Sequence, residues 1–175
     1  GKITGHEEDT QWLSEEVLRL TKLINEKLWC EEDSFYYDLW KGDIHSKVKS
    51  IGAYWALLAD IVPKDRLESF LAHLENPAVP TLSADHPNYC KDGAYWLGSV
   101  WAPTNYMVLK GLEKVGKQKL AFEIAENHLS NVVEVFNKTG TVWENYSPEE
   151  AAPGNPAKSD FVGWTGLVPI SVLFE

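Results

Sequence analysis

The chain has 175 residues, a length that one hydrophobic core can organise. Its 26 acidic residues against 16 basic residues give a net charge of -10, which opposes binding to the polyanionic backbone of nucleic acid. No apolar run approaches the roughly 20 residues that a membrane span needs, so the sequence predicts neither a nucleic-acid partner nor a membrane anchor.

Apolar residues recur at helical spacing along most of the chain. They follow this spacing from Leu13 to Leu28 and again from Ala121 to Phe136. Pro63 and Pro103 stand where the first turn of a helix accepts proline, and Gly116 is placed to end the second of these helices. The sequence therefore predicts an all-α protein of about six helices. We expect them near residues 9–29, 48–62, 63–75, 102–115, 117–137 and 164–174.

Long aromatic loops separate these predicted helices. The chain contains eight Trp and seven Tyr, more than a core of this size requires, because Trp is bulky and its N–H must find a partner. Many of the rings fall in the loops "WCEEDSFYYDLWKGD", "PTLSADHPNYCKDGAYWLGSVW" and "TGTVWENYSPEEAAPGNPAKSDFVGW". Helical hairpins with ring-rich loops indicate a scaffold whose loops build a site at one end.

The sequence gives no indication of a metal site or a cofactor. Cys30 and Cys90 stand far apart, and the five His residues show neither H-x-H nor H-E-x-x-H spacing. There is no G-x-S-x-G elbow and no glycine-rich phosphate loop. The sequence therefore predicts no metal and no cofactor.

One carboxylate stands out within "TGTVWENYSPEE". Glu144 lies between Trp143 and Tyr146 and next to the amide of Asn145. A glutamate in a loop after a helix is most often a cap or a surface charge, so the residues by themselves leave its role open.

Three motifs in order resemble the C-terminal part of the trehalase-like glycoside hydrolases. They are "YWLGSVWAPTNYMVLKGLEKVG" (95–116), "GTVWENYSPE" (140–149) and "DFVGWTGLVPI" (160–170), with a fainter likeness in "CEEDSFYYD" (30–38). The nearest group is glycoside hydrolase family 63, which includes relatives of processing α-glucosidase and mannosylglycerate hydrolase. That family folds as an (α/α)6 toroid. The resemblance implies that residues 1–175 are about the C-terminal half of such a catalytic domain, partnered by the remaining half of the same domain.

The resemblance also implies a reaction and a base. The position of Glu144 in "WENY" matches the catalytic base of these inverting enzymes, which would make the protein a glycoside hydrolase cleaving α-linked glucose- or mannose-type units. Its substrate would be an oligosaccharide or a small glycoside. Tyr95, Trp96 and Trp101 match the family unit Tyr-Trp-x-Gly-x-Val-Trp, whose second Trp floors a sugar subsite.

Four further residues are expected near the sugar. Asn105 follows Trp101 by one helical turn and could bond a hydroxyl or only cap backbone. The other three are the rings beside Glu144, Trp143 and Tyr146, and Trp164, which is expected at the rim of the same cavity. For Trp96, Trp101 and Trp164, filling the core is the competing interpretation.

Two departures keep a second function open. Leu97 occupies a position where many relatives have Arg, and no Glu-Ser-Gly-x-Asp string supplies the family's general acid. The alternative is therefore a non-catalytic carbohydrate-binding or scaffolding protein with the helical toroid fold. Residues 1–175 alone are expected to be inactive, because half of the proton chemistry is missing.

Overall fold

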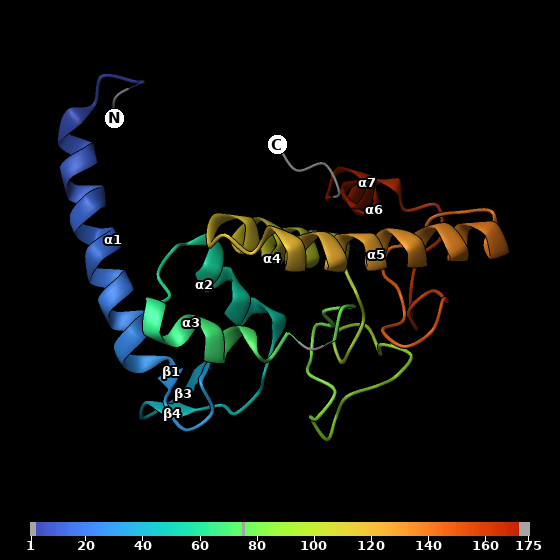
Figure 1. The fold of residues 1–175 in the computed structure, drawn as a ribbon, viewed down its shortest axis with the longest axis horizontal. Coiled ribbons are helices and arrows are strands. Elements are labelled where there is room, and N and C mark those ends of the chain that lie inside the picture. Colours follow the sequence, from blue (N-terminus) through green and yellow to red (C-terminus); the bar gives the residue numbers. More distant parts are fainter. Residues whose placement is uncertain (1–2, 75, 172–175) are drawn as a thin grey trace. The chain divides into compact units, whose positions relative to one another are not determined.

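The structure is a computed structural model that describes residues 3–74 and 76–171. The chain divides into two compact units, residues 1–47 and residues 48–175 (Figure 1). The protein is rich in helices, as the sequence predicts, and it also contains two small antiparallel sheets. No helix within the described ranges is long and apolar enough to cross a lipid bilayer.

The first unit consists of one long helix and two short ladders. Helix α1 spans Glu7–Lys27 and confirms the helix predicted near residues 9–29. The strands that follow are two residues each: β1 Trp29–Cys30, β2 Phe35–Tyr36, β3 Leu39–Trp40 and β4 Ile44–His45. β1 pairs with β2 and β3 pairs with β4, both antiparallel. From the sequence alone this region is expected to be loop, because a two-residue strand is too short to show alternation.

Part of the apolar surface of α1 is exposed. Trp12 is 64% exposed, and Leu13, Val17, Leu20 and Leu23 are also exposed. These are residues that an amphipathic helix turns toward a packing partner. Among the residues described, α1 therefore carries an apolar stripe on the surface, defined by these five side chains.

The second unit is built around two long helices. Its elements are η1 Ile51–Tyr54, α2 Trp55–Leu58, α3 Lys64–Leu71, α4 Ala102–Lys114, α5 Gln118–Thr139, α6 Val162–Thr165 and α7 Leu167–Ser171. Helix α4 packs against α2, α5 and α7, and Figure 1 shows α4 and α5 side by side. Gly111 permits the approach of α4 to α2, since a Cβ there would lie 2.8 Å from the Cβ of Leu57.

Three predicted helices need correction. The segment 48–62 holds only η1 and α2, because Ser50 is extended and pairs with Leu82. Helix α3 ends at Leu71 rather than near residue 75. The segment 164–174 contains the end of α6 and the whole of α7, separated at Gly166, and residues 172–174 lie outside the described residues.

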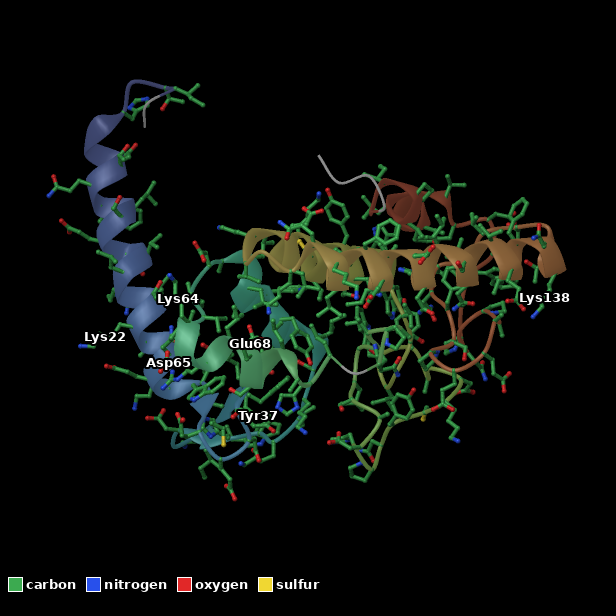
Figure 2. All side chains as sticks on the ribbon, in the orientation of Figure 1. Lys22, Tyr37, Lys64, Asp65, Glu68 and Lys138 are labelled. Atoms are coloured by element: carbon green, nitrogen blue, oxygen red, sulfur yellow. The ribbon has the colours of Figure 1, made fainter. Side chains whose placement is uncertain are left out.

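The end of α5 leads directly into the segment of interest. Gly140 caps the helix in the left-handed conformation (φ 74°), and its N–H donates to the Phe136 carbonyl at 2.7 Å. Lys138, labelled in Figure 2, donates to the Ala151 carbonyl at 3.1 Å and so ties the last turn to the loop beyond Glu144.

A buried cluster joins the helices to these loops. Val100 and Tyr146 belong to it with residues from α4, α5 and α7, namely Ala102, Val132, Val135 and Val168, together with Ala78. Because the loops contribute side chains to the core, their backbones are held against the helices rather than free in solvent.

Candidate active site

Main-chain hydrogen bonds bring the two motif-bearing loops together. Val100 and Tyr146 exchange both backbone bonds, at 2.9 and 3.0 Å. The N–H of Glu144 donates to the Lys158 carbonyl at 2.9 Å, and Trp143 forms a bridge with Ser159. Glu144 is therefore fixed at its backbone from a third segment of the chain.

The Glu144 side chain is buried, and no ion pair among the described residues gives it a counter-charge. It is 5% exposed and accepts a hydrogen bond from the Tyr95 hydroxyl at 3.3 Å. None of the ion pairs found among the described residues involves it. Burial of a carboxylate that lacks a cation costs free energy, so such a group is a strong candidate for a chemical role.

Tyr95 presents its hydroxyl from a strained turn. Ala94 and Tyr95 have φ values of 36° and 64°, in the left-handed region that side chains rarely adopt. The indole N–H of Trp101 donates to the Tyr95 carbonyl at 3.0 Å and stabilises the turn. Desolvation, followed by the nearby charge of Glu144, raises the pKa of Tyr95, so the hydroxyl keeps the proton that it donates.

Four of the predicted rings form one cluster beside this pair. Trp96 stacks on Trp101 with centroids 4.6 Å apart and planes 7° from parallel. Tyr95 meets Trp101 edge-on at 4.8 Å, and Trp164 lies 5.5 Å from Trp101. Trp101 is 1% exposed, whereas Trp96 and Trp164 are 51% and 44% exposed. Trp101 thus forms the centre of the cluster, and the other two indoles offer surface to a ligand.

The remaining predicted residues hold the loops in the structure. Asn105 is buried and donates to the Ala78 carbonyl at 2.9 Å, while its Oδ1 has no partner among the described residues. The Trp143 indole donates to the Thr139 hydroxyl at 3.0 Å. Tyr146 packs in the buried cluster, and its hydroxyl accepts from the Trp143 N–H at 3.0 Å.

Of three buried polar residues near Glu144, Thr165 and Ser99 were not singled out from the sequence, and Asn145 was noted only as the neighbour of Glu144. Thr165 donates its hydroxyl to the Trp143 carbonyl, and Ser99 and Asn145 lie in the two loops that meet. Serine, threonine and asparagine are common in loops, so their identity carries little information. The loop glycines Gly93 and Gly154 were the available signal, because glycine often marks a close approach.

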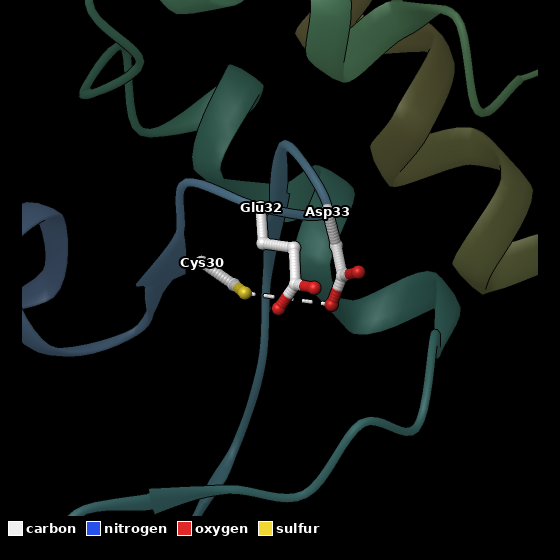
Figure 3. A group of neighbouring side chains, drawn as sticks. All are labelled: Cys30, Glu32 and Asp33. Atoms are coloured by element: carbon white, nitrogen blue, oxygen red, sulfur yellow. Dashed lines mark hydrogen bonds between the residues drawn. The ribbon is translucent and has the colours of Figure 1, made fainter.

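A separate group in the first unit has the residue types of a metal site. Possible ligand atoms of Cys30, Glu32 and Asp33 lie within 4.8 Å of one another (Figure 3). However, the Lys47 ammonium donates to Asp33 Oδ2 at 2.5 Å and to Cys30 Sγ at 3.1 Å. A metal ion would have to displace this ammonium, so we assign the group a structural role.

Comparisons with known proteins agree with the motifs. The family model described as mannosylglycerate hydrolase MGH1-like glycoside hydrolase domain matches residues 1–165. The chain is 35% identical over 142 residues to a protein of Borreliella burgdorferi described as uncharacterized, covering 74% of this chain and 30% of that protein. It is 27% identical over 168 residues to mannosylglycerate hydrolase of Rubrobacter radiotolerans, covering 90% and 36%.

A solved structure has the same fold. The family 63 mannosylglycerate hydrolase of Thermus thermophilus, in complex with glucose, matches with a TM-score of 0.73 and 22% identity, over 94% of this chain and 38% of that one. The chain belongs to the MGH1-like glycoside hydrolase domain family. It spans about a third of the length of the two curated relatives named above.

Proposed function

We propose that the full-length protein is an inverting glycoside hydrolase that acts on α-linked glucose- or mannose-type units, with Glu144 as its general base. The observation that carries the proposal is the buried Glu144 carboxylate, which has no cationic partner within the described residues and receives the Tyr95 hydroxyl beside partly exposed indoles. Family membership supports the same reaction class.

In this reaction, Glu144 takes a proton from a water molecule whose oxygen attacks the anomeric carbon. The glycosidic bond breaks with its electron pair on the leaving oxygen, which a carboxylic acid on the opposite face protonates. In inverting enzymes the two carboxyl groups are roughly 6.5–9.5 Å apart, which leaves room for the water. Residues 1–175 show no family acid motif, so the acid belongs to the remaining half of the (α/α)6 toroid.

The rings provide the binding surface for the sugar. Trp96 and Trp164 stack on the apolar C–H faces of a sugar, and Trp101 supports them from behind. Asn105 is buried and holds the chain at Ala78 by donating to its carbonyl. Trp143 and Tyr146 shape the wall next to the base, because the Tyr146 hydroxyl fixes the Trp143 backbone.

A second candidate function is binding or scaffolding without catalysis. Leu97 favours it, because this apolar side chain is 40% exposed at a position where many relatives have Arg. A protein of this kind would bind the same sugars on the same rings and release no product.

The test is the configuration of the first product. The full-length protein is incubated with α-glucosides and α-mannosides, and the released sugar is followed by proton NMR before mutarotation. The proposal expects the β anomer first, since water attacks without a glycosyl-enzyme intermediate. The α anomer as first product would contradict it, and sugar binding without turnover would support the second candidate.

A further inference from the structure

Two glycines let the loops that carry Tyr95 and Glu144 pack closely against each other. A Cβ on Gly154 would collide with Asn145 Oδ1 and lie 3.0 Å from Ser99 Oγ. A Cβ on Gly93 would collide with Ser99 Oγ and lie 3.0 Å from its Cα. Only glycine allows this approach at either position, and Gly93 also has a φ of 98°.

The side chains at this contact are fully buried. Ser99 and Asn145 are both 0% exposed. Asn145 donates through Nδ2 to the Pro156 carbonyl at 3.2 Å, while Asn145 Oδ1 and Ser99 Oγ have no partner among the described residues. Leaving buried polar atoms unpaired costs free energy, so stability alone does not explain their presence.

Each half of the contact adjoins one member of the pair. Asn145 follows Glu144, and its carbonyl accepts the N–H of Gly154 at 3.0 Å. On the other side, the carbonyl of Gly93 accepts the N–H groups of Leu97 and Ser99, at 3.1 and 3.2 Å. These two bonds close the turn in which Tyr95 adopts its positive φ. The contact between the two loops therefore adjoins both Tyr95 and Glu144 along the chain.

We propose that Ser99 and Asn145, packed against Gly93 and Gly154, are positioning residues that hold the Tyr95 hydroxyl on the Glu144 carboxylate. This inference rests on the proposed function and deepens it, because it assigns the orientation of the base to a contact between the two loops that carry Tyr95 and Glu144. Small displacements matter here, since a shift of about 1 Å at a reacting group can lower a rate by about 100-fold.

The first test compares two Gly→Ala variants of the full-length protein. Gly154→Ala puts a methyl group into the contact, and Gly52→Ala is the control, since its Cβ would meet only Ser50 Oγ at an ordinary 3.6 Å. We expect Gly154→Ala to lower kcat by about 10- to 100-fold with KM much less affected, and Gly52→Ala to leave both unchanged. Equal kcat in all three proteins would overturn the proposal.

A double-mutant cycle separates positioning from general disruption. Tyr95→Phe removes the hydroxyl, and it is combined with Gly154→Ala. If the methyl group acts by breaking the Tyr95–Glu144 bond, the double variant loses little more kcat than Gly154→Ala alone. Multiplicative losses would mean that the contact acts on the fold and not on the pair.

A third readout does not depend on turnover. Tyrosine labelled with ¹³C at Cζ is titrated by NMR, and Tyr95→Phe assigns the Tyr95 signal. Burial and the charge of Glu144 hold the pKa of Tyr95 above its ordinary value. In Gly154→Ala we expect this pKa to fall part of the way back, because the contribution of Glu144 weakens. An unchanged pKa would contradict the proposal.

These readouts keep the two proposals distinct. If the wild type hydrolyses no glycoside but Gly154→Ala alters the Tyr95 titration, the proposed function fails and the positioning contact stands. If Glu144→Gln abolishes turnover while Gly154→Ala changes neither kcat nor the titration of Tyr95, the proposed function stands and the positioning contact fails. Should Gly154→Ala not fold, Asn145→Ser, which loses the Nδ2 donor without adding bulk, is expected to give the same two changes.

Discussion

The Tyr95 hydroxyl donates to Glu144 Oε1 at 3.3 Å, although 49 residues separate the two in the sequence. One partner lies in a strained turn before α4 and the other lies in the loop after α5. The bond therefore joins two of the three motifs that carry the resemblance, and Tyr95 in turn meets Trp101 of the indole cluster.

Glu144→Gln is expected to lower kcat by at least about 100-fold, with KM much less affected, because it keeps the shape of the side chain and removes its basicity. Steady-state kinetics on the full-length protein measure this. Glu150→Gln, an exposed glutamate of the same loop, is the matched control and should turn over normally. Near-normal turnover in Glu144→Gln would mean that "WENY" has a structural role and that Glu144 is not the base.

Two Trp→Ala variants should separate binding from folding. Trp96→Ala is expected to weaken sugar binding by about 1–3 kcal/mol, the order of a lost aromatic hot spot, with little loss of stability because half of the ring is already exposed. Trp101→Ala should in addition destabilise the fold by about 3–5 kcal/mol, because its buried indole leaves a cavity. Calorimetric titration and thermal unfolding measure the two effects. Equal unfolding temperatures in the two variants would contradict the central position of Trp101.

His128 should make stability depend on pH in the mildly acidic range. Burial lowers the pKa of His128 from 6.5 to about 4. Between these values the unfolded state binds more protons than the folded state, so the free energy of unfolding falls as the pH drops from 6.5 to 4. The loss is on the order of 3 kcal/mol.

Urea unfolding at several pH values measures this loss. His128→Phe should flatten the dependence in that window, whereas His6→Gln, which removes an exposed imidazole, should not. Hydrogen bonds from Lys47 and Lys49 lower the pKa of Asp33 and Asp85, so these carboxylates contribute stability that is lost at more acidic pH. A wild-type stability that stays constant from pH 7 to pH 4 would refute the role of His128.

The 175-residue chain expressed by itself should self-associate. The apolar stripe on α1, which includes Trp12, Leu13 and Val17, is a contiguous surface of the kind that soluble monomers cover. Sedimentation velocity is expected to show oligomers whose population falls in the double variant Leu13→Glu/Val17→Glu. A chain that remains monomeric and unfolds in one sharp transition would contradict the proposal that it is part of a larger toroid.

Long helices were predictable because each carries several turns of apolar periodicity. The segments for α1, α4 and α5 agree with the structure to within two residues. The short elements were not predictable, since each of β1 to β4 has two residues and α2 has four. Elements this short depend on contacts with distant parts of the chain, as Ser50 depends on its pairing with Leu82. The local sequence does not indicate such a partner.

The sequence selected the residues of the candidate site but did not indicate their arrangement. The motifs selected Tyr95, Trp101 and Glu144, and the structure places Tyr95 in contact with both of the others. Which indole is central and which is exposed depends on packing between the two loops. The spacing of residues along the chain does not indicate this packing. Ser99 was missed for the same reason, and the contact that Asn145 makes could not be foreseen, because their surroundings come from Gly93 and Gly154.

The paired backbone bonds of Val100 and Tyr146 use no side-chain atoms. These backbone bonds near Glu144 therefore do not require a particular side chain at exposed positions such as Trp96, Leu97 and Trp164. If Glu144 is the base that we propose, sugar preference can be redesigned by exchanging these surface residues while the base stays in place. Under the proposed function, choice of substrate and ability to react are therefore traits that separate mutations can change.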